Sequence, residues 1–143
     1  MSVGDAAEVE GLVLAFDFGL RHIGVASGQT ITRTATALTT LTARDGRPDW
    51  DSVRTLVKEW RPNRLIVGLP LNMDDTESEM SERARSFAGR LAKETSLPVE
   101  MADERLSSRA AAEDYGNKSG NRSDQSHAAA AALIAETWLA ERG

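Results

Sequence analysis

The residues from Leu12 to Phe18 form an apolar run that carries a single charged side chain, Asp17, near its end. Such a run, closed by Gly19, is typical of a β-strand in a domain core. An ionised carboxylate that leaves water without a partner is strongly destabilised, or its pKa shifts until it is neutral. We therefore expect a metal ion, a hydrogen-bond donor or a bound phosphate beside Asp17. In the alternative interpretation, the strand end is exposed and Asp17 only caps a turn.

The composition limits which chemistry can compensate that carboxylate. The chain has 143 residues, enough for one domain that buries roughly two-thirds of its unfolded surface. It contains no cysteine and only two histidines, His22 and His127, so thiolate sites are excluded and a histidine-rich zinc site is not expected. A bound metal would be held mainly by carboxylates and water, which favours Mg²⁺ or Mn²⁺.

The N-terminal residues, the length of the apolar stretches and the net charge together indicate a soluble protein. Residues 1–10 are polar and acidic and are predicted to be a flexible N-terminal extension, followed by a single domain over residues 11–143. No apolar stretch approaches the ~20 residues that cross a bilayer, so we expect a cytoplasmic protein without a membrane partner. The net charge of −5 argues against a generally basic nucleic-acid-binding surface, but it allows a local basic patch.

The rest of the sequence predicts three strands followed by alternating helices and strands. Strands are predicted at 12–18, 22–27, 32–42, 64–70 and 98–102, and helices from Asp49 or Asp51 to Pro62 and at 78–95, 107–115 and 124–141, with a loop over 44–48. Tight connections predict an antiparallel meander for the first three strands, and the helical connections predict parallel pairing for the later ones. The expected fold class is α/β, a mixed five-stranded sheet with helices on both faces.

Four acidic residues stand where such a sheet would bring them together. Asp103 and Glu104 end the last strand, and Asp124 opens the final helix. In open α/β sheets, chemistry collects beyond the carboxyl ends of the strands, so Asp17 and Glu104 are expected to share one crevice. Small residues one turn and more after Asp124 would let its helix lie close to the sheet: Ala128, Ala131 and Ala135. In the alternative interpretation, Asp124 is an ordinary helix N-cap.

Several carboxylates in one pocket repel each other unless divalent cations neutralise them. Two metal ions about 3.5–4 Å apart activate water and offset phosphate charge in phosphodiester hydrolysis. Five basic residues cluster in the sequence around the acids and are candidates for holding the phosphate backbone: Arg21, Arg105, Arg109, Lys118 and Arg122. Arg105 is the strongest candidate because it follows the acids directly. The alternative is that all five are solvated surface residues.

Other conspicuous residues have less specific interpretations. The tryptophans at 50, 60 and 138 are interpreted as core or rim residues rather than base-stacking platforms. His127 is interpreted as a helical surface histidine, although it would be suited to orienting water or phosphate. The segment 116–123 is either a flap over substrate or an ordinary connector.

The motifs together resemble the YqgF/RuvX family over nearly all of residues 11–139. The matching segments are Asp17-Phe18-Gly19, Arg21-His22-Ile23-Gly24-Val25-Ala26, Val67-Gly68-Leu69-Pro70-Leu71-Asn72-Met73, Asp103-Glu104-Arg105 and Asp124-Gln125-Ser126-His127-Ala128-Ala129. This family is described as Holliday junction resolvases and as pre-ribosomal-RNA nucleases with a ribonuclease H-like fold. The resemblance carries over Asp17, Glu104 and Asp124 as metal ligands and catalytic acids, with Asp103 and Arg105 adjoining.

The resemblance implies a metal-dependent nuclease that uses a metal-activated water. Its expected substrate is the precursor of the small-subunit ribosomal RNA (pre-16S rRNA), cut at its 5′ end, with possible association with a ribosomal particle. Resolution of branched DNA (a Holliday junction) is the alternative. Two other classes stay open, namely a nucleotide-binding phosphotransferase and a catalytically silent nucleic-acid-binding module.

The sequence departs from the family pattern at two points. Asp75 replaces the usual glycine in the segment Met73 to Thr76, where a turn with positive φ is expected. Ser107-Ser108 stands where threonine is frequent, which is a mild change.

Overall fold

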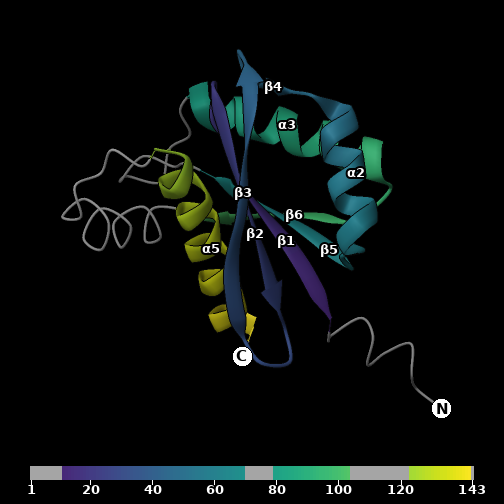
Figure 1. The fold of residues 1–143 in the computed structure, drawn as a ribbon, viewed down its shortest axis with the longest axis vertical. Coiled ribbons are helices and arrows are strands. Elements are labelled where there is room, and N and C mark those ends of the chain that lie inside the picture. Colours follow the sequence, from purple (N-terminus) through teal and green to yellow (C-terminus); the bar gives the residue numbers. More distant parts are fainter. Residues whose placement is uncertain (1–10, 70–78, 104–122, 143) are drawn as a thin grey trace.

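The computed structural model describes residues 11–69, 79–103 and 123–142, which form one mixed sheet with helices on both faces (Figure 1). The strands are β1 (Leu12–Asp17), β2 (His22–Gln29), β3 (Thr34–Arg44), β4 (Arg47–Pro48), β5 (Arg64–Leu69) and β6 (Val99–Asp103). The helices are α2 (Trp50–Trp60), α3 (Glu79–Thr95) and α5 (Ser123–Arg142). The strand order is β4-β3-β2-β1-β5-β6.

The pairing directions confirm the predicted mixed sheet. β1 pairs antiparallel with β2, and β2 pairs antiparallel with β3. β1 pairs parallel with β5, and β5 pairs parallel with β6. The carboxyl ends of β1, β5 and β6 therefore lie at the same edge of the sheet.

The sheet has six strands rather than the predicted five, because the segment predicted as a loop contains β4. Arg47 and Pro48 pair with Arg44 and Ala43. Between them, Asp45 and Gly46 have φ values of 53° and 82°. Two consecutive residues with positive φ are what a two-residue hairpin turn requires, and Asp-Gly is a favoured sequence for it. This turn folds the chain back as a short edge strand.

The second strand does not end at residue 27 as predicted, but continues through Gly28 and Gln29. Both residues belong to β2 and pair with Val13 and Leu12 of β1. The chain instead turns over residues 30–33, where Arg33 has a φ of 58°. Pairing with the central strand therefore outweighs the turn preference of Gly28.

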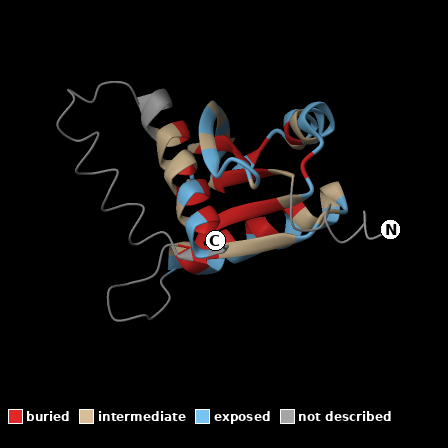
Figure 2. Ribbon diagram, turned by 90° about the horizontal axis from the view of Figure 1, so that it is seen from below, coloured by how far each residue is buried: buried red, intermediate tan, exposed pale blue. Residues whose placement is uncertain are grey.

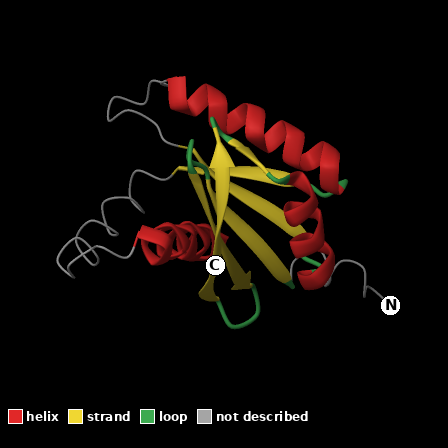
Figure 3. Cartoon of the chain, turned by 45° about the horizontal axis from the view of Figure 1, so that its top comes forward, coloured by secondary structure: helices red, strands yellow, loops and turns green. Residues whose placement is uncertain are grey.

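The core has two layers because the sheet is covered on both faces (Figures 2 and 3). Alternate residues of β1 point to opposite sides: Leu14 and Phe16 pack with α3, and Val13 and Ala15 pack with α5. Phe18, which follows β1, packs with α3 as well. The strand β5 is buried from Leu65 to Leu69, which is typical of a continuous apolar run in a strand covered on both faces. No helix in the described part of the chain is both long and apolar enough for a membrane span.

Phe87 of α3 is the centre of the first core layer, and its loss should be costly. It is 4% exposed, and its ring centroid lies 5.3 Å from Phe18 and 5.6 Å from Trp50. We expect Phe87→Ala to lower the free energy of unfolding by about 3–5 kcal/mol, measured by urea denaturation. Ile31→Ala, at a side chain that is 68% exposed, should change it by less than about 0.5 kcal/mol. Equal losses in the two variants would contradict this packing.

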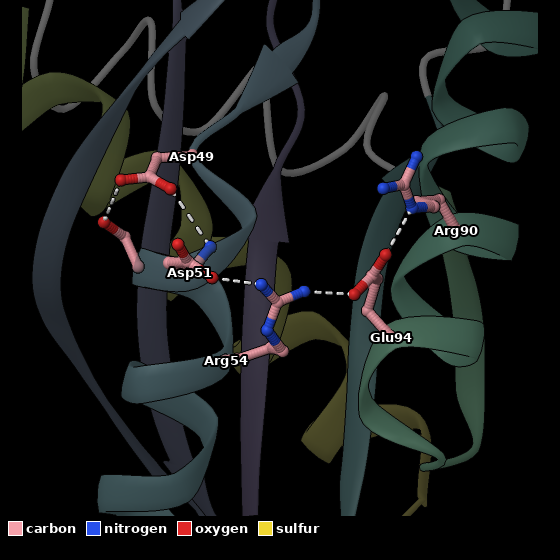
Figure 4. Close-up of polar contacts among 6 residues, drawn as sticks. Asp49, Asp51, Arg54, Arg90 and Glu94 are labelled. Atoms are coloured by element: carbon pink, nitrogen blue, oxygen red, sulfur yellow. Dashed lines mark hydrogen bonds and ion pairs between the residues drawn. The ribbon is translucent and has the colours of Figure 1, made fainter.

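On the face of the sheet opposite to α5, a series of polar contacts joins α2 to α3 (Figure 4). Asp49 caps α2 by accepting a hydrogen bond from the backbone N–H of Asp51 at 3.0 Å, which confirms one of the two predicted caps. Arg54 of α2 pairs with both Asp51 and Glu94. Glu94 also accepts a 2.6 Å hydrogen bond from Arg90. Hydrogen bonds from Arg90, and to a smaller extent from Arg54, hold the pKa of Glu94 below its ordinary value.

The tryptophans occupy the positions that the sequence predicted. Trp138 is 6% exposed and belongs to the core layer under α5, whereas Trp50 is partly buried against the layer under α3. Trp60 is 37% exposed. The predicted helix at 107–115 and residues 116–122 of the segment predicted at 116–123 lie outside the described residues, and residue 123 is the first of α5.

Candidate active site

Asp17 is the last residue of β1 and is half-buried at the edge where β1, β5 and β6 end. Its neighbours Phe16 and Phe18 pack with α3, so strand alternation directs Asp17 to the opposite face, which carries α5. The backbone partner of Asp17 across the antiparallel pair is Gly24 of β2. Asp17 therefore stands at the junction of a strand end and the face covered by α5.

β6 ends at the same edge, two strands away from β1. Leu69 of β5 pairs with Asp103 of β6, so both parallel strands reach the level of Asp17. Neighbouring strands lie about 4.8 Å apart, which puts the ends of β1 and β6 roughly 10 Å from one another. Ala102 belongs to the core layer under α5. The chain that continues from β6 thus starts from the edge where Asp17 lies.

α5 packs directly on β2 at its N-terminal end. A Cβ atom added to Gly24 would lie only 1.9 Å from the carbonyl oxygen of His127 and 2.9 Å from the backbone nitrogen of Ala128. The predicted small-residue face of α5 is buried as expected, with Ala131 and Ala135 both 0% exposed. Because Gly24 is the backbone partner of Asp17, the first turns of α5 lie beside the end of β1.

A pair of stacked histidines fixes the same contact from the side chains. The imidazole rings of His22 and His127 have centroids 4.9 Å apart and an interplanar angle of 19°. His127 is therefore half-buried against β2, and its interpretation as a plain surface histidine was wrong. The reason is that α5 begins over the start of β2, which the sequence pattern of one helix does not reveal. We infer that this stack helps to fix where α5 begins.

The backbone of α5 includes Asp124, one turn before Ala128, but side chains before His127 in this helix lie outside the described residues. The same holds for the side chain of Asp103, while Glu104 lies wholly outside them. Within the described portion, no group of three or more His, Cys, Asp or Glu side chains is placed to hold a metal ion. The convergence of the acids thus stays a prediction.

Of the five predicted basic residues, the structure describes Arg21. Its side chain is exposed, and its backbone oxygen accepts a 2.8 Å hydrogen bond from Ala43 of β3, which places it at the edge where β1 ends. The other four lie outside the described residues: Arg105, Arg109, Lys118 and Arg122.

The candidate donors fit a hard divalent cation. The predicted ligands are all carboxylates, and oxygen donors are what Mg²⁺ and Mn²⁺ prefer. Asp17 is half-buried at a strand end, and the stacked histidines nearby lie against each other. An oxygen-rich site held by Asp17 and acids from β6 and α5 would be suited to such an ion.

Sequence reasoning missed Gly24 and His22 as determinants of this site. The available signal was a glycine inside an otherwise apolar strand, which often marks a close backbone approach. Here the approaching backbone is that of α5.

This strand order, with an aspartate ending the central strand and a helix packed beside it, is that of a ribonuclease H-like fold. A solved structure titled "T. thermophilus RuvC in complex with Holliday junction substrate" matches 92% of this chain and 96% of its own, with a TM-score of 0.58 and 18% identity. A fowlpox virus resolvase solved with Holliday junction DNA matches 92% of this chain and 98% of its own, with a TM-score of 0.53 and 12% identity. At these identities, both likenesses support the fold.

The family model described as "RuvX: Holliday junction resolvase" matches residues 11–141, and the chain belongs to this family. A relative from Chromohalobacter salexigens is 53% identical over 91% of this chain and 90% of its own. A relative from Azotobacter vinelandii is 54% identical over 92% of this chain and 94% of its own. Both relatives carry the name "Putative pre-16S rRNA nuclease". The resemblance noted from the sequence motifs is thus confirmed.

Proposed function

We propose that this protein is a metal-dependent nuclease that hydrolyses phosphodiester bonds in structured nucleic acid. The observation that carries the proposal is the seating of α5 on Gly24, the backbone partner of Asp17. This contact brings the helix that contains Asp124 to the strand end that carries Asp17. In this proposal, a helix displaced by one side-chain layer would no longer bring Asp124 to Asp17.

In this proposal, Asp17, Glu104 and Asp124 hold Mg²⁺ or Mn²⁺, with Asp103 in support. Bound ions would supply an activated water and neutralise charge on the phosphate. The half-buried position of Asp17 keeps its carboxylate oriented by the strand. Arg21 is exposed at the same edge and binds the phosphate backbone, together with Arg105, Arg109, Lys118 and Arg122.

The preferred substrate is pre-16S rRNA, cut at its 5′ end during ribosome biogenesis in the cytoplasm. The support is the shared name of relatives that match about nine-tenths of the chain at more than half identity. Cleavage of Holliday junctions is the second candidate, and the description of the family supports it. Association with a ribosomal particle follows from the first candidate.

The test compares substrates and metals for the wild type and two variants of α5. Purified protein is incubated with labelled pre-16S rRNA, a four-way DNA junction or ATP, each with Mn²⁺, Mg²⁺ or EDTA. Asp124→Asn removes a proposed ligand, and Glu136→Gln is the matched control because Glu136 is exposed on the same helix. We expect metal-dependent cutting of pre-16S rRNA that Asp124→Asn reduces by about a hundredfold or more and Glu136→Gln leaves unchanged.

Each of the other outcomes would indicate a different substrate or a different class of protein. Cutting of the junction alone would replace the ribosomal substrate with branched DNA. Turnover of ATP without cutting would indicate a phosphotransferase. Tight binding of nucleic acid without turnover of any substrate would indicate a silent binding module.

A further inference from the structure

A cleft opens on the opposite face of the sheet from α5, between the turn that joins β3 to β4 and the helix α3. It has a volume of about 560 Å³. Its lining combines arginines from two elements, Arg47 of β4 and Arg83 and Arg90 of α3, with the rings of Phe18, Trp50 and Phe87. Pockets that hold small ligands span about 300–1,000 Å³. The cleft therefore has room for one nucleotide, but not for a duplex.

The charge of the cleft is opposite to that of the protein. Three arginines line it against one acid, Asp45, in a chain whose net charge is −5. Arg83 contacts Asp45 at 3.1 Å and Glu79 at 3.8 Å, and Arg90 pairs with Glu94 (Figure 4). Arg47 is exposed and makes no ion pair with any residue that the structure describes. A local concentration of arginine in an acidic protein is suited to a phosphate-bearing partner.

The aromatic wall gives the cleft a second kind of recognition. Phe18, Phe87 and Trp50 form a continuous series of ring contacts, and the guanidinium of Arg90 lies 5.0 Å from the centre of the Trp50 ring. Trp50 is only partly covered by these neighbours. Unpaired bases stack on aromatic side chains and arginine planes, whereas paired bases in a duplex offer no free face.

The cleft adjoins the candidate active site along the chain. Phe18, in its wall, directly follows Asp17. The turn at its rim is tied to the same edge, since Gly46 donates a 2.9 Å hydrogen bond to the backbone oxygen of Leu20. A nucleic acid strand that crosses the edge of the sheet from Asp17 would enter the cleft on the α3 side.

We propose that this cleft binds one unpaired nucleotide of the substrate strand next to the cleavage point. Its phosphate lies between Arg47 and Arg83, and its base packs against Trp50. The proposal rests on the nuclease function proposed above, and it adds a preference for a single-stranded segment beside the cut. It could not be predicted from the sequence, because Arg47 and Arg83 line one cleft only in the folded chain, where Arg83 of α3 contacts Asp45 in the turn before β4.

The test measures binding in the absence of cleavage. Asp17→Asn protein, without divalent ions, is titrated with fluorescein-labelled polyuridine and with a duplex RNA of equal length, and with UMP. Fluorescence anisotropy, or displacement of the labelled polyuridine, gives the Kd of each ligand. The double variant Arg47→Gln/Arg83→Gln should weaken polyuridine binding about tenfold. It should also reduce the slope of log Kd against log salt concentration by about 0.7, the value for one phosphate contact on a single strand. Arg33→Gln is the control, because Arg33 is exposed at the far edge of the sheet.

Two single variants distinguish the loss of a specific contact from misfolding: one retains the positive charge, and the other changes the fluorescence of the cleft. Arg47→Lys should retain most of the affinity, and Trp50→Phe should remove the quenching of tryptophan fluorescence that polyuridine causes in the parent. Unchanged polyuridine affinity in the double variant would overturn the proposal, as would an equal loss in Arg33→Gln. A loss confined to UMP or to the duplex would also overturn it. If polyuridine binds through the cleft but the wild type cuts no substrate, only the proposed nuclease function is overturned.

Discussion

Asp17→Asn should abolish cutting while leaving the fold intact. The substitution keeps the size of the side chain but removes the charge that a divalent ion needs from a ligand at the end of β1. We expect the rate of cleavage to fall at least about a thousandfold, which corresponds to about 4 kcal/mol of transition-state stabilisation. The measurement is single-turnover cleavage of the best substrate with saturating Mn²⁺.

Thermal denaturation distinguishes a variant that no longer binds metal from one that no longer folds. A ligand that binds only the native state raises its stability, so Mn²⁺ should raise the Tm of the wild type and have no such effect on Asp17→Asn. Without metal, the variant should be at least as stable as the wild type if the proposed acids converge, because one charge is then removed from among like charges.

The matched control is Asp51→Asn, on the face opposite to Asp17. Asp51 is 83% exposed and pairs with Arg54, and such surface pairs contribute about 0–1 kcal/mol. This control should keep full activity and the full response to Mn²⁺. An active Asp17→Asn, or a variant that still gains stability from Mn²⁺, would exclude Asp17 as a metal ligand.

Much of the fold could be predicted from periodicity. The run from Leu12 to Asp17 and the run from Arg64 to Leu69 are buried strands because both faces of a central strand need apolar side chains. The helix that follows Asp49 was predicted from an N-cap and its spaced apolar residues. The hairpin at Asp45-Gly46 was missed although its turn signal was present, because the strand after it has only two residues.

The candidate site was predictable in part, for a different reason. A carboxylate in an apolar strand is visible in sequence, so Asp17 could be identified from the chain alone. The close approach of α5 to Gly24 and the stack of His22 on His127 depend on the distance between two elements about a hundred residues apart. No local pattern encodes that distance, and the same holds for the cleft that Arg47 and Arg83 share.

Gly24→Ala should damage both stability and activity, because the added methyl has no free space. Its carbon would lie 1.9 Å from the carbonyl oxygen and 2.3 Å from the carbonyl carbon of His127, and these are backbone atoms that cannot rotate away. Either α5 or β2 must move. Overpacking of this kind costs about 1–3 kcal/mol, which should appear as a lower urea midpoint.

The expected effect on cleavage is larger than the loss of stability explains. A shift of α5 moves Asp124 relative to Asp17, and a displacement of about 1 Å at a catalytic group reduces rates about a hundredfold. We therefore expect the variant to be folded at low temperature but at least about a hundredfold slower, with a weaker gain in Tm from Mn²⁺.

Gly89→Ala is the matched control, because Gly89 lies in α3 and the added methyl would have no described atom within 4 Å beyond its chain neighbours and the local helix backbone. Alanine is the better helix former, so this variant should be more stable by about 0.5–1 kcal/mol and equally active. Full activity in Gly24→Ala would mean that cleavage does not need α5 at this depth. The acids of β1 and α5 would then not act together, and the carboxylate site would have to be built from β1 and the chain that follows β6.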